Sequence, residues 1–335
     1  MTISDPDAAK LGWLALVAEN MYLPGSRTPS ANALLPQLGF VLVGLLVATD
    51  VDPVVFELDA LGEPKGLGFG DTTYYGFLAH AAADPTRFVV AVRGTMAPAE
   101  WAIDARFPLI SHPHGGGMAV ESGFWSIYRT MQVVDLDGAA NAAEAAPGLK
   151  ARIGAGSVTV VGHSLGSALA TYLTYDLVGL GGLQVSACLF ASPNTGNAAW
   201  AAGFDAAVTD YALFNYILDI VPKVPFDAPP LIQYSSLSRA RILDPRTAEA
   251  NIAFDLLSHH HVICYSAMLD YAATAAWPGV IGEPTWHSVL GPVGGLSLNH
   301  DLAVATAAAV EQLDDFDRVA VRLISVTADA KGAHV

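Results

Sequence analysis

The chain has 335 residues and a mass of 34.9 kDa, with 53% hydrophobic and only 14% charged residues. This composition excludes a disordered, mainly solvating protein and favours strands that are buried on both faces of a sheet. Acidic residues outnumber basic ones 32 to 16, which gives a net charge of −16 with neutral histidines. Nucleic acid and anionic membrane surfaces are therefore poor expected partners.

No targeting or membrane segment is predicted. The start, MTISDPDAAK, carries acids where a secretory signal needs positive charge. The longest apolar run covers residues 38–48, whereas a membrane-spanning helix needs about 20 apolar residues. This run is therefore expected in the core of the protein. We expect a chain that is cytoplasmic, exported without a Sec signal, or already trimmed. Cys188 and Cys264 are too few for a disulfide framework and are predicted to be buried thiols.

Strands and helices are predicted to alternate along the chain. The predictions are a helix over 8–22, strands over 74–78 and 88–92, helices over 123–134 and within 139–151 (interrupted near Pro147), a strand over 158–161, a helix over 167–177, strands over 183–191, 211–217 and 233–243, and a helix over 262–275. This alternation implies βαβ crossovers and a mainly parallel sheet. A stretch rich in glycine and proline at 278–297 then breaks the pattern, and 300–313 (helical) and 319–326 (strand-like) follow it.

The motif Gly162-His163-Ser164-Leu165-Gly166 has the pattern G-x-S-x-G. A predicted strand enters it and a predicted helix leaves it, which is the context of a nucleophile elbow. Such a turn strains the serine backbone, so the residues two positions away must be nearly free of side chain, and both are glycine. The motif predicts that Ser164 is a nucleophile and that the amide of Leu165 faces a developing oxyanion.

Five blocks stand out along the chain: FVVAVRGT (88–95) followed by Trp101 and Asp104, VESGFWSIY (120–128), VTVVGHSLGSALA (158–170), FASPNTGN (190–197) and LDIVPKVP (218–225). Together and in this order they resemble the class 3 (fungal-type) lipase family of α/β hydrolases. The resemblance covers about residues 8–275 and looks like that of a bacterial member. It implies an α/β-hydrolase fold, a mostly parallel central sheet flanked by helices. We expect this domain over 1–277 and a C-terminal extension of unknown role over 278–335, a candidate to pack on the same domain.

A serine nucleophile needs a histidine to take its proton and a carboxylate to orient that histidine. Judged from its neighbours alone, Asp219 fits a loop-capping role as well as it fits the role of triad acid. The resemblance implies that it is the triad acid. Family members often place the histidine five residues before a tyrosine, which selects His260 with Tyr265. His261 and His300 are the runner-up bases, because each also opens a predicted helical run.

The three histidines at 259–261 also invite a metal interpretation. His260 and Cys264 would share a helical face, but no further ligands at metal spacing lie nearby in the sequence. We therefore predict no metal, and serine hydrolase chemistry needs no organic cofactor.

Two motifs compete for the oxyanion hole. The resemblance implies Thr95, the residue after Arg-Gly, together with Leu165. Residues 114–117 spell the HGGG motif of another lipase and esterase group, which should directly follow a core strand. Pro113 argues against a central strand there, so the glycine run is predicted to form a hairpin before Val120.

The segment 97–110 coincides with the lid region of the family. A helix presenting Trp101, Ile103 and Phe107 would cover the serine in water and open toward hydrophobic esters. The alternative is a fixed surface helix whose aromatic side chains pack into the core.

These observations predict a serine carboxylic ester hydrolase that cleaves hydrophobic esters such as acylglycerols through an acyl-enzyme. A phospholipase or an aryl- or polyester esterase of the same fold is the alternative substrate assignment. A non-catalytic hydrolase-fold protein that binds a lipid or a partner is the alternative of another class. The expected partner is the ester substrate, with a lipid–water interface as a further candidate. The oligomeric state stays open.

Overall fold

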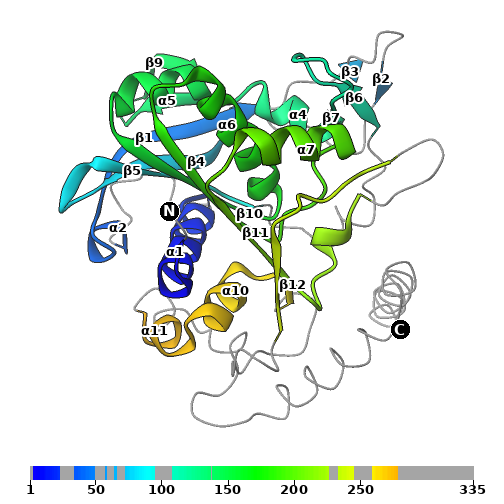
Figure 1. Ribbon diagram of the computed structural model, residues 1–335. Coiled ribbons are helices and arrows are strands. Elements are labelled where there is room, and N and C mark those ends of the chain that lie inside the picture. Colours follow the sequence, from blue (N-terminus) through cyan, green and yellow to red (C-terminus); the bar gives the residue numbers. More distant parts are fainter. Residues whose placement is uncertain are drawn as a thin grey trace, which may run out of the picture.

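A computed structural model describes residues 3–22, 34–49, 57–58, 64–65, 72–94, 108–136, 138–225, 233–244 and 259–277 (Figure 1). The expected C-terminal extension, 278–335, lies outside the described residues.

Within the described ranges, nine strands form one central sheet. In spatial order they are β13 (Ala240–Leu243), β12 (Tyr211–Tyr216), β11 (Gln184–Phe190), β10 (Ser157–His163), β5 (Asp84–Val92), β4 (Thr72–Ala81), β1 (Phe40–Thr49), β8 (Gln132–Asp135) and β9 (Gly138–Glu144). Every pairing from β13 to β5 is parallel, and every pairing from β5 to β9 is antiparallel. Only β4 and β8 therefore run opposite to the other strands of this sheet, so the predicted, mostly parallel α/β-hydrolase sheet is confirmed.

Two short hairpins form separate two-stranded sheets. One pairs β2 (Glu57–Leu58) with β3 (Pro64–Lys65), and the other pairs β6 (Leu109–Ser111) with β7 (Ala119–Glu121). The second hairpin contains the glycine run of the HGGG motif.

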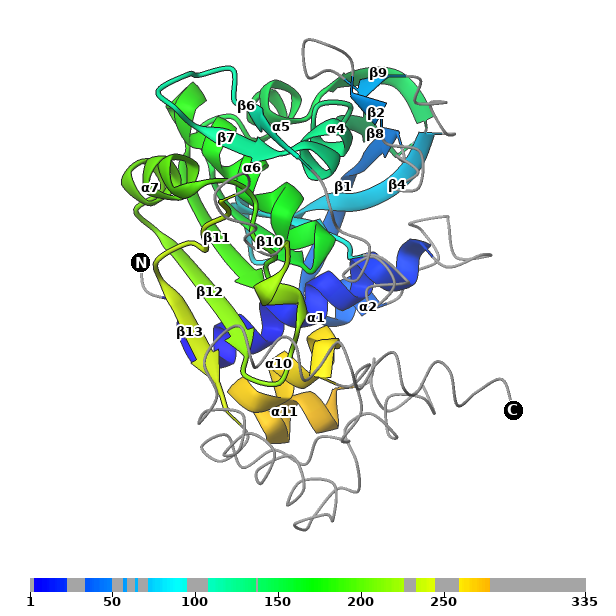
Figure 2. The same ribbon diagram turned by 90° about the vertical axis from the view of Figure 1, so that its right-hand side faces the viewer.

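Helices cover both faces of the sheet (Figures 1 and 2). One face carries α1 (Asp5–Tyr22), α10 (Val262–Leu269) and α11 (Tyr271–Ala276), and the other carries α4 (Ser122–Tyr128), α5 (Ala145–Ile153), α6 (Leu165–Leu180) and α7 (Ala198–Ala207). A short helix α2 (Leu34–Gln37) precedes β1, and a 3₁₀ turn (Val221–Lys223) follows β12. None of the helices in the described ranges is long and apolar enough to cross a membrane.

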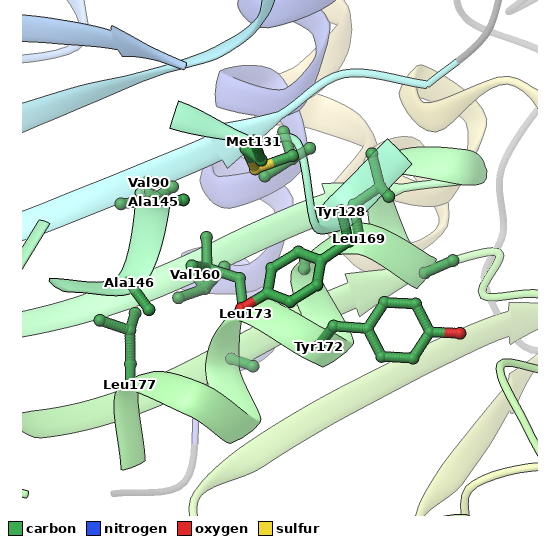
Figure 3. Close-up of a cluster of buried hydrophobic side chains, with 14 of the residues drawn as sticks. Val90, Tyr128, Met131, Ala145, Ala146, Val160, Leu169, Tyr172, Leu173 and Leu177 are labelled. Atoms are coloured by element: carbon green, nitrogen blue, oxygen red, sulfur yellow. The ribbon is translucent and has the colours of Figure 1, made fainter. Parts of the chain in front are cut away.

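Strand β10 shows how one sequence fills two cores. Because side chains alternate across a sheet, Val158 and Val160 pack with the α6 face while Val161 packs with the α1 face. On the α6 side, Leu169 and Leu173 lie over Val160 (Figure 3). A central strand buried on both faces reads as a continuous apolar run, as the composition suggests. Both cysteines are buried and neither forms a disulfide, as predicted.

Two predicted helices are wrong at one end. The prediction over 123–134 fails after Tyr128, because 132–135 is hydrogen-bonded to β1 as β8. The alanine-rich stretch is β9 up to Glu144 and helix only from Ala145. Pro147 does not interrupt α5, because it lies in the first turn, where backbone amides have no helical partner. Strand pairing overrode local helix propensity at both places.

Two further predictions were too long. Of the predicted strand over 233–243, only β13 is paired as a strand in the main sheet. The helix predicted over 262–275 is broken at Asp270, which ends α10 and caps α11 by accepting a hydrogen bond from the amide of Ala273. Helix α7, which the periodicity did not predict, begins with the same kind of cap at Asn197.

Candidate active site

Ser164 lies at the sharp turn between β10 and α6. Its backbone has φ 58° and ψ −129°, a conformation that side-chain-bearing residues rarely adopt. Its amide donates a 3.0 Å hydrogen bond to the carbonyl oxygen of Phe190 on β11, which fixes the turn to the neighbouring strand. The side chain is almost fully buried, at 1% exposed. The strained serine expected of a nucleophile elbow is therefore present.

Backbone crowding explains the two glycines of the motif. A Cβ atom added at Gly162 would lie 2.3 Å from the carbonyl oxygen of Gly166. One added at Gly166 would lie 2.3 Å from the carbonyl oxygen of Val92, at the end of β5. Strand and helix approach so closely here that no side chain fits, which is the reason the sequence argument gave for glycine at both positions.

Asp219 lies in the turn after β12 and is buried. Its Oδ1 accepts a hydrogen bond from the amide of Val221 at 2.9 Å. Its Oδ2 accepts two more, from His260 Nδ1 at 2.8 Å and from the hydroxyl of Tyr265 at 2.5 Å. Burial alone would raise the pKa of Asp219, but the nearby His260 and these three donors outweigh burial and lower it. The site thus holds an ionised carboxylate against the imidazole.

The His260 ring packs against the ring of His163. Its centroid is 4.7 Å from that of His163, the residue that precedes Ser164. With Nδ1 bonded to Asp219, the proton on that nitrogen leaves Nε2 as the acceptor of a neutral ring. Among the described residues, neither His260 Nε2 nor Ser164 Oγ has a hydrogen-bond partner, and both atoms are buried. His260 Nε2 is therefore available as a proton acceptor and Ser164 Oγ as a donor, either to one another or to a substrate.

The other predicted site residues are placed as follows. Leu165 is the first residue of α6, so its amide is one of the helix-start amides without a helical partner. His261 is the N-cap residue of α10. The remaining candidates, Thr95, Trp101, Ile103, Phe107 and His300, lie outside the described residues.

The HGGG motif forms the turn of the β6–β7 hairpin, as predicted. This hairpin is apart from the nine-stranded sheet, so the motif does not follow a core strand. Its three glycines have φ between 67° and 76°, and added Cβ atoms would meet nothing within 4 Å. Within the described ranges, no group of three or more histidine, cysteine, aspartate or glutamate side chains is placed to hold a metal ion.

Sequence reasoning missed three residues that contact this constellation. Tyr265 served only to choose the histidine, yet its hydroxyl bonds the acid. His163 was taken as the variable position of the elbow, and Glu19 as part of the first helix. A charged residue among the apolar side chains of α1 was the available signal for Glu19, and a histidine ending a buried strand was the signal for His163.

The sheet order and the strained serine at the end of β10 are those of the α/β-hydrolase fold. Residues 89–228 match the protein family described as Lipase (class 3). Among solved structures, the Rhizomucor miehei lipase propeptide complex superposes with a TM-score of 0.50 at 18% identity, covering 70% of this chain and 66% of that one. At this identity the likeness shows the shared fold.

Two curated relatives extend the family match. The secreted mono- and diacylglycerol lipase A of Penicillium cyclopium is 31% identical over 171 residues, covering 50% of this chain and 53% of the relative. Phospholipase A1 EG1, chloroplastic/mitochondrial, of Oryza sativa subsp. indica is 32% identical over 189 residues, covering 49% and 42%. The chain thus spans about half the length of these curated relatives. They are fungal and plant proteins and give no support to the expected bacterial member.

Proposed function

We propose that this protein is a serine carboxylic ester hydrolase acting on lipid esters. The observations that support the proposal are the buried, hydrogen-bonded pair of Asp219 and His260 and a serine held at positive φ. A protein that only binds lipid has no need of a strained serine, whose conformation costs about 1–3 kcal/mol. The family match of the surrounding chain supports the same chemistry.

The proposed reaction uses each group in one role. Ser164 Oγ attacks the ester carbonyl carbon while His260 Nε2 takes the hydroxyl proton. Asp219 accepts from Nδ1, so it holds the required tautomer and stabilises the imidazolium that forms. The amide of Leu165 and, by resemblance, Thr95 would stabilise the oxyanion; such a donor contributes about 3 kcal/mol to the transition state. His260 then protonates the leaving alcohol, and water repeats the sequence to release the acid.

The proposed substrates are hydrophobic esters, with acylglycerols first. A relative named as a mono- and diacylglycerol lipase supports this assignment, and relatives named as phospholipases A1 support a phospholipid ester as the second candidate. A lipid–water interface and a lid at 97–110 belong to the same proposal. Hydrolysis of a diacylglycerol compared with a phosphatidylcholine, each in mixed micelles, distinguishes the two substrate classes.

Replacement of the nucleophile tests the proposed activity. We expect Ser164→Ala to lose hydrolysis of a chromogenic short-chain ester by at least about 10³-fold and to lose labelling by a fluorophosphonate. Ser186→Ala is the matched control, because Ser186 pairs with Thr159 near the opposite end of β10. Equal rates for wild type and Ser164→Ala would refute the proposed hydrolase activity and favour a protein that only binds a lipid or a partner.

The identity of the base needs its own comparison. We expect His260→Gln to abolish labelling of Ser164, whereas His261→Gln should keep it. Truncation after Trp277 then tests His300, because a truncated chain that remains active excludes it. A labelled His260→Gln variant would assign the base to another histidine.

A further inference from the structure

A second pair of a histidine and a carboxylate touches the candidate site from the side of α1. Glu19 Oε1 lies 2.9 Å from His163 Nδ1, and His163 Nε2 lies 2.6 Å from the backbone carbonyl oxygen of His260. The side chains of His163 and Glu19 are 5% and 17% exposed. The imidazole of His163, the residue before the proposed nucleophile, therefore connects α1 to the backbone of the proposed base.

The hydrogen-bond chemistry of these contacts determines where the protons are. A carbonyl oxygen can only accept, so His163 Nε2 carries a proton and donates it to His260. Burial by itself would raise the pKa of Glu19, but the hydrogen bond from His163 and the neighbouring imidazoles of His163, His261 and His260 outweigh it and lower the pKa. The carboxylate of Glu19 is thus a hydrogen-bond partner for Nδ1 on the opposite side of the His163 ring from the His260 carbonyl.

We propose that Glu19 and His163 are positioning residues that hold the backbone of His260 at a set separation from Ser164. The proposal rests on the ester hydrolase function proposed above. His163 is covalently joined to Ser164, so its bond to the His260 carbonyl links nucleophile and base without using either reacting atom.

The end of strand β5 meets the same pair. A Cβ atom added at Gly94 would lie 3.2 Å from Glu19 Oε1 and 3.3 Å from His163 Nδ1. Gly94 precedes Thr95, the proposed oxyanion donor. The pair thus lies where the chain segments of nucleophile, base and oxyanion donor meet, which is where positioning matters for rate. A misplacement of about 1 Å is enough to cost 10²-fold.

Three variants separate positioning from support of the fold. Glu19→Ala leaves His163 without its acceptor, and we expect kcat for a soluble short-chain ester to fall by about 10- to 100-fold with KM within about twofold. Glu19→Gln keeps a hydrogen-bond partner for Nδ1 and should restore most of kcat. Tyr128→Phe, which removes the partly buried hydrogen bond to Asp176 near the C-terminal end of α6, is the stability control and should keep wild-type kcat.

The overturning results are distinct from those of the proposed function. A folded Glu19→Ala with wild-type kcat, or an equal loss of kcat in Tyr128→Phe, would refute the positioning role while leaving Ser164-dependent hydrolysis intact. Should Glu19→Ala fail to fold, ¹⁵N NMR of the wild type decides. We expect His163 Nε2 to carry the proton that it donates to the His260 carbonyl, and an unprotonated Nε2 would refute the positioning contact. Full activity of Ser164→Ala would refute the proposed function itself.

Discussion

The elbow and the β6–β7 hairpin are both glycine-rich turns, and they use glycine for opposite reasons. At the elbow, added Cβ atoms on Gly162 and Gly166 would overlap backbone carbonyl oxygens of neighbouring segments. At the hairpin, the space around Gly115, Gly116 and Gly117 is open, and only the positive φ favours glycine there. The elbow is therefore constrained by tertiary packing, while the hairpin is constrained by local backbone conformation.

The two turns also differ in what holds them. The elbow is joined to β11, and through His163 to α1 and to His260. The hairpin is anchored by His112, a buried ring whose pKa is lowered to about 4 by burial and by neighbouring His114. His112 packs against the rings of Trp125 and Trp200. A substitution at the elbow should thus disturb the chemistry, whereas one at the hairpin should disturb local stability.

The largest expected effect comes from Gly166→Ala. The new methyl group must displace the end of β5, because the carbonyl oxygens of Val92 and Arg93 lie within 2.5 Å of it. We expect the free energy of unfolding to fall by about 3 kcal/mol or more, with fluorophosphonate labelling lost. The matched control is Gly179→Ala on the same helix, where the added Cβ meets nothing within 4 Å. Wild-type stability and labelling in Gly166→Ala would show that the backbone at this position can accept a side chain without disturbing the fold or Ser164.

An intermediate effect is expected at Glu121, where the strand leaving the hairpin meets α4. Its buried carboxylate accepts from the amides of Gly123 and Phe124, and burial raises its pKa from 4.5 to about 8 in spite of these bonds. Between those values the unfolded chain has lost a proton that the folded chain keeps. Stability should therefore fall as pH rises from 5 to 8, by up to about 1 kcal/mol per pH unit.

Urea denaturation at pH 5, 6, 7 and 8 measures this dependence. The Glu121→Gln variant cannot ionise, so its unfolding free energy should vary less over the same range. Parallel curves for the two proteins would show that Glu121 does not titrate with a raised pKa.

The smallest effect is expected from Gly116→Val in the hairpin. Its φ of 67° is unfavourable for a β-branched residue, so we expect a loss of roughly 1–2 kcal/mol in unfolding free energy. The value of kcat should stay within about twofold of wild type. A collapse of kcat in a folded variant would mean that the HGGG motif builds the oxyanion hole after all.

The accuracy of sequence interpretation differed along the chain for physical reasons. The elbow was predictable because strand, turn and helix signals and two obligatory glycines are all local. The region 123–151 was misassigned in part because β8 exists only through its pairing with β1, far away in sequence. His260 was singled out by a family register, and its contact with Asp219 joins residues 41 positions apart, which no local pattern encodes.

By itself, the sequence determined the strained turn at Ser164 and the buried parallel strands, because these depend on short-range sterics and on hydrophobic patterning. Only the tertiary structure decided which charges meet. Glu19 and His163 are 144 positions apart and Asp219 and Tyr265 are 46 apart, and folding brings each pair within hydrogen-bond distance. The energy of a buried charge depends on its partners, and those partners are set by how the sheet and its covering helices pack.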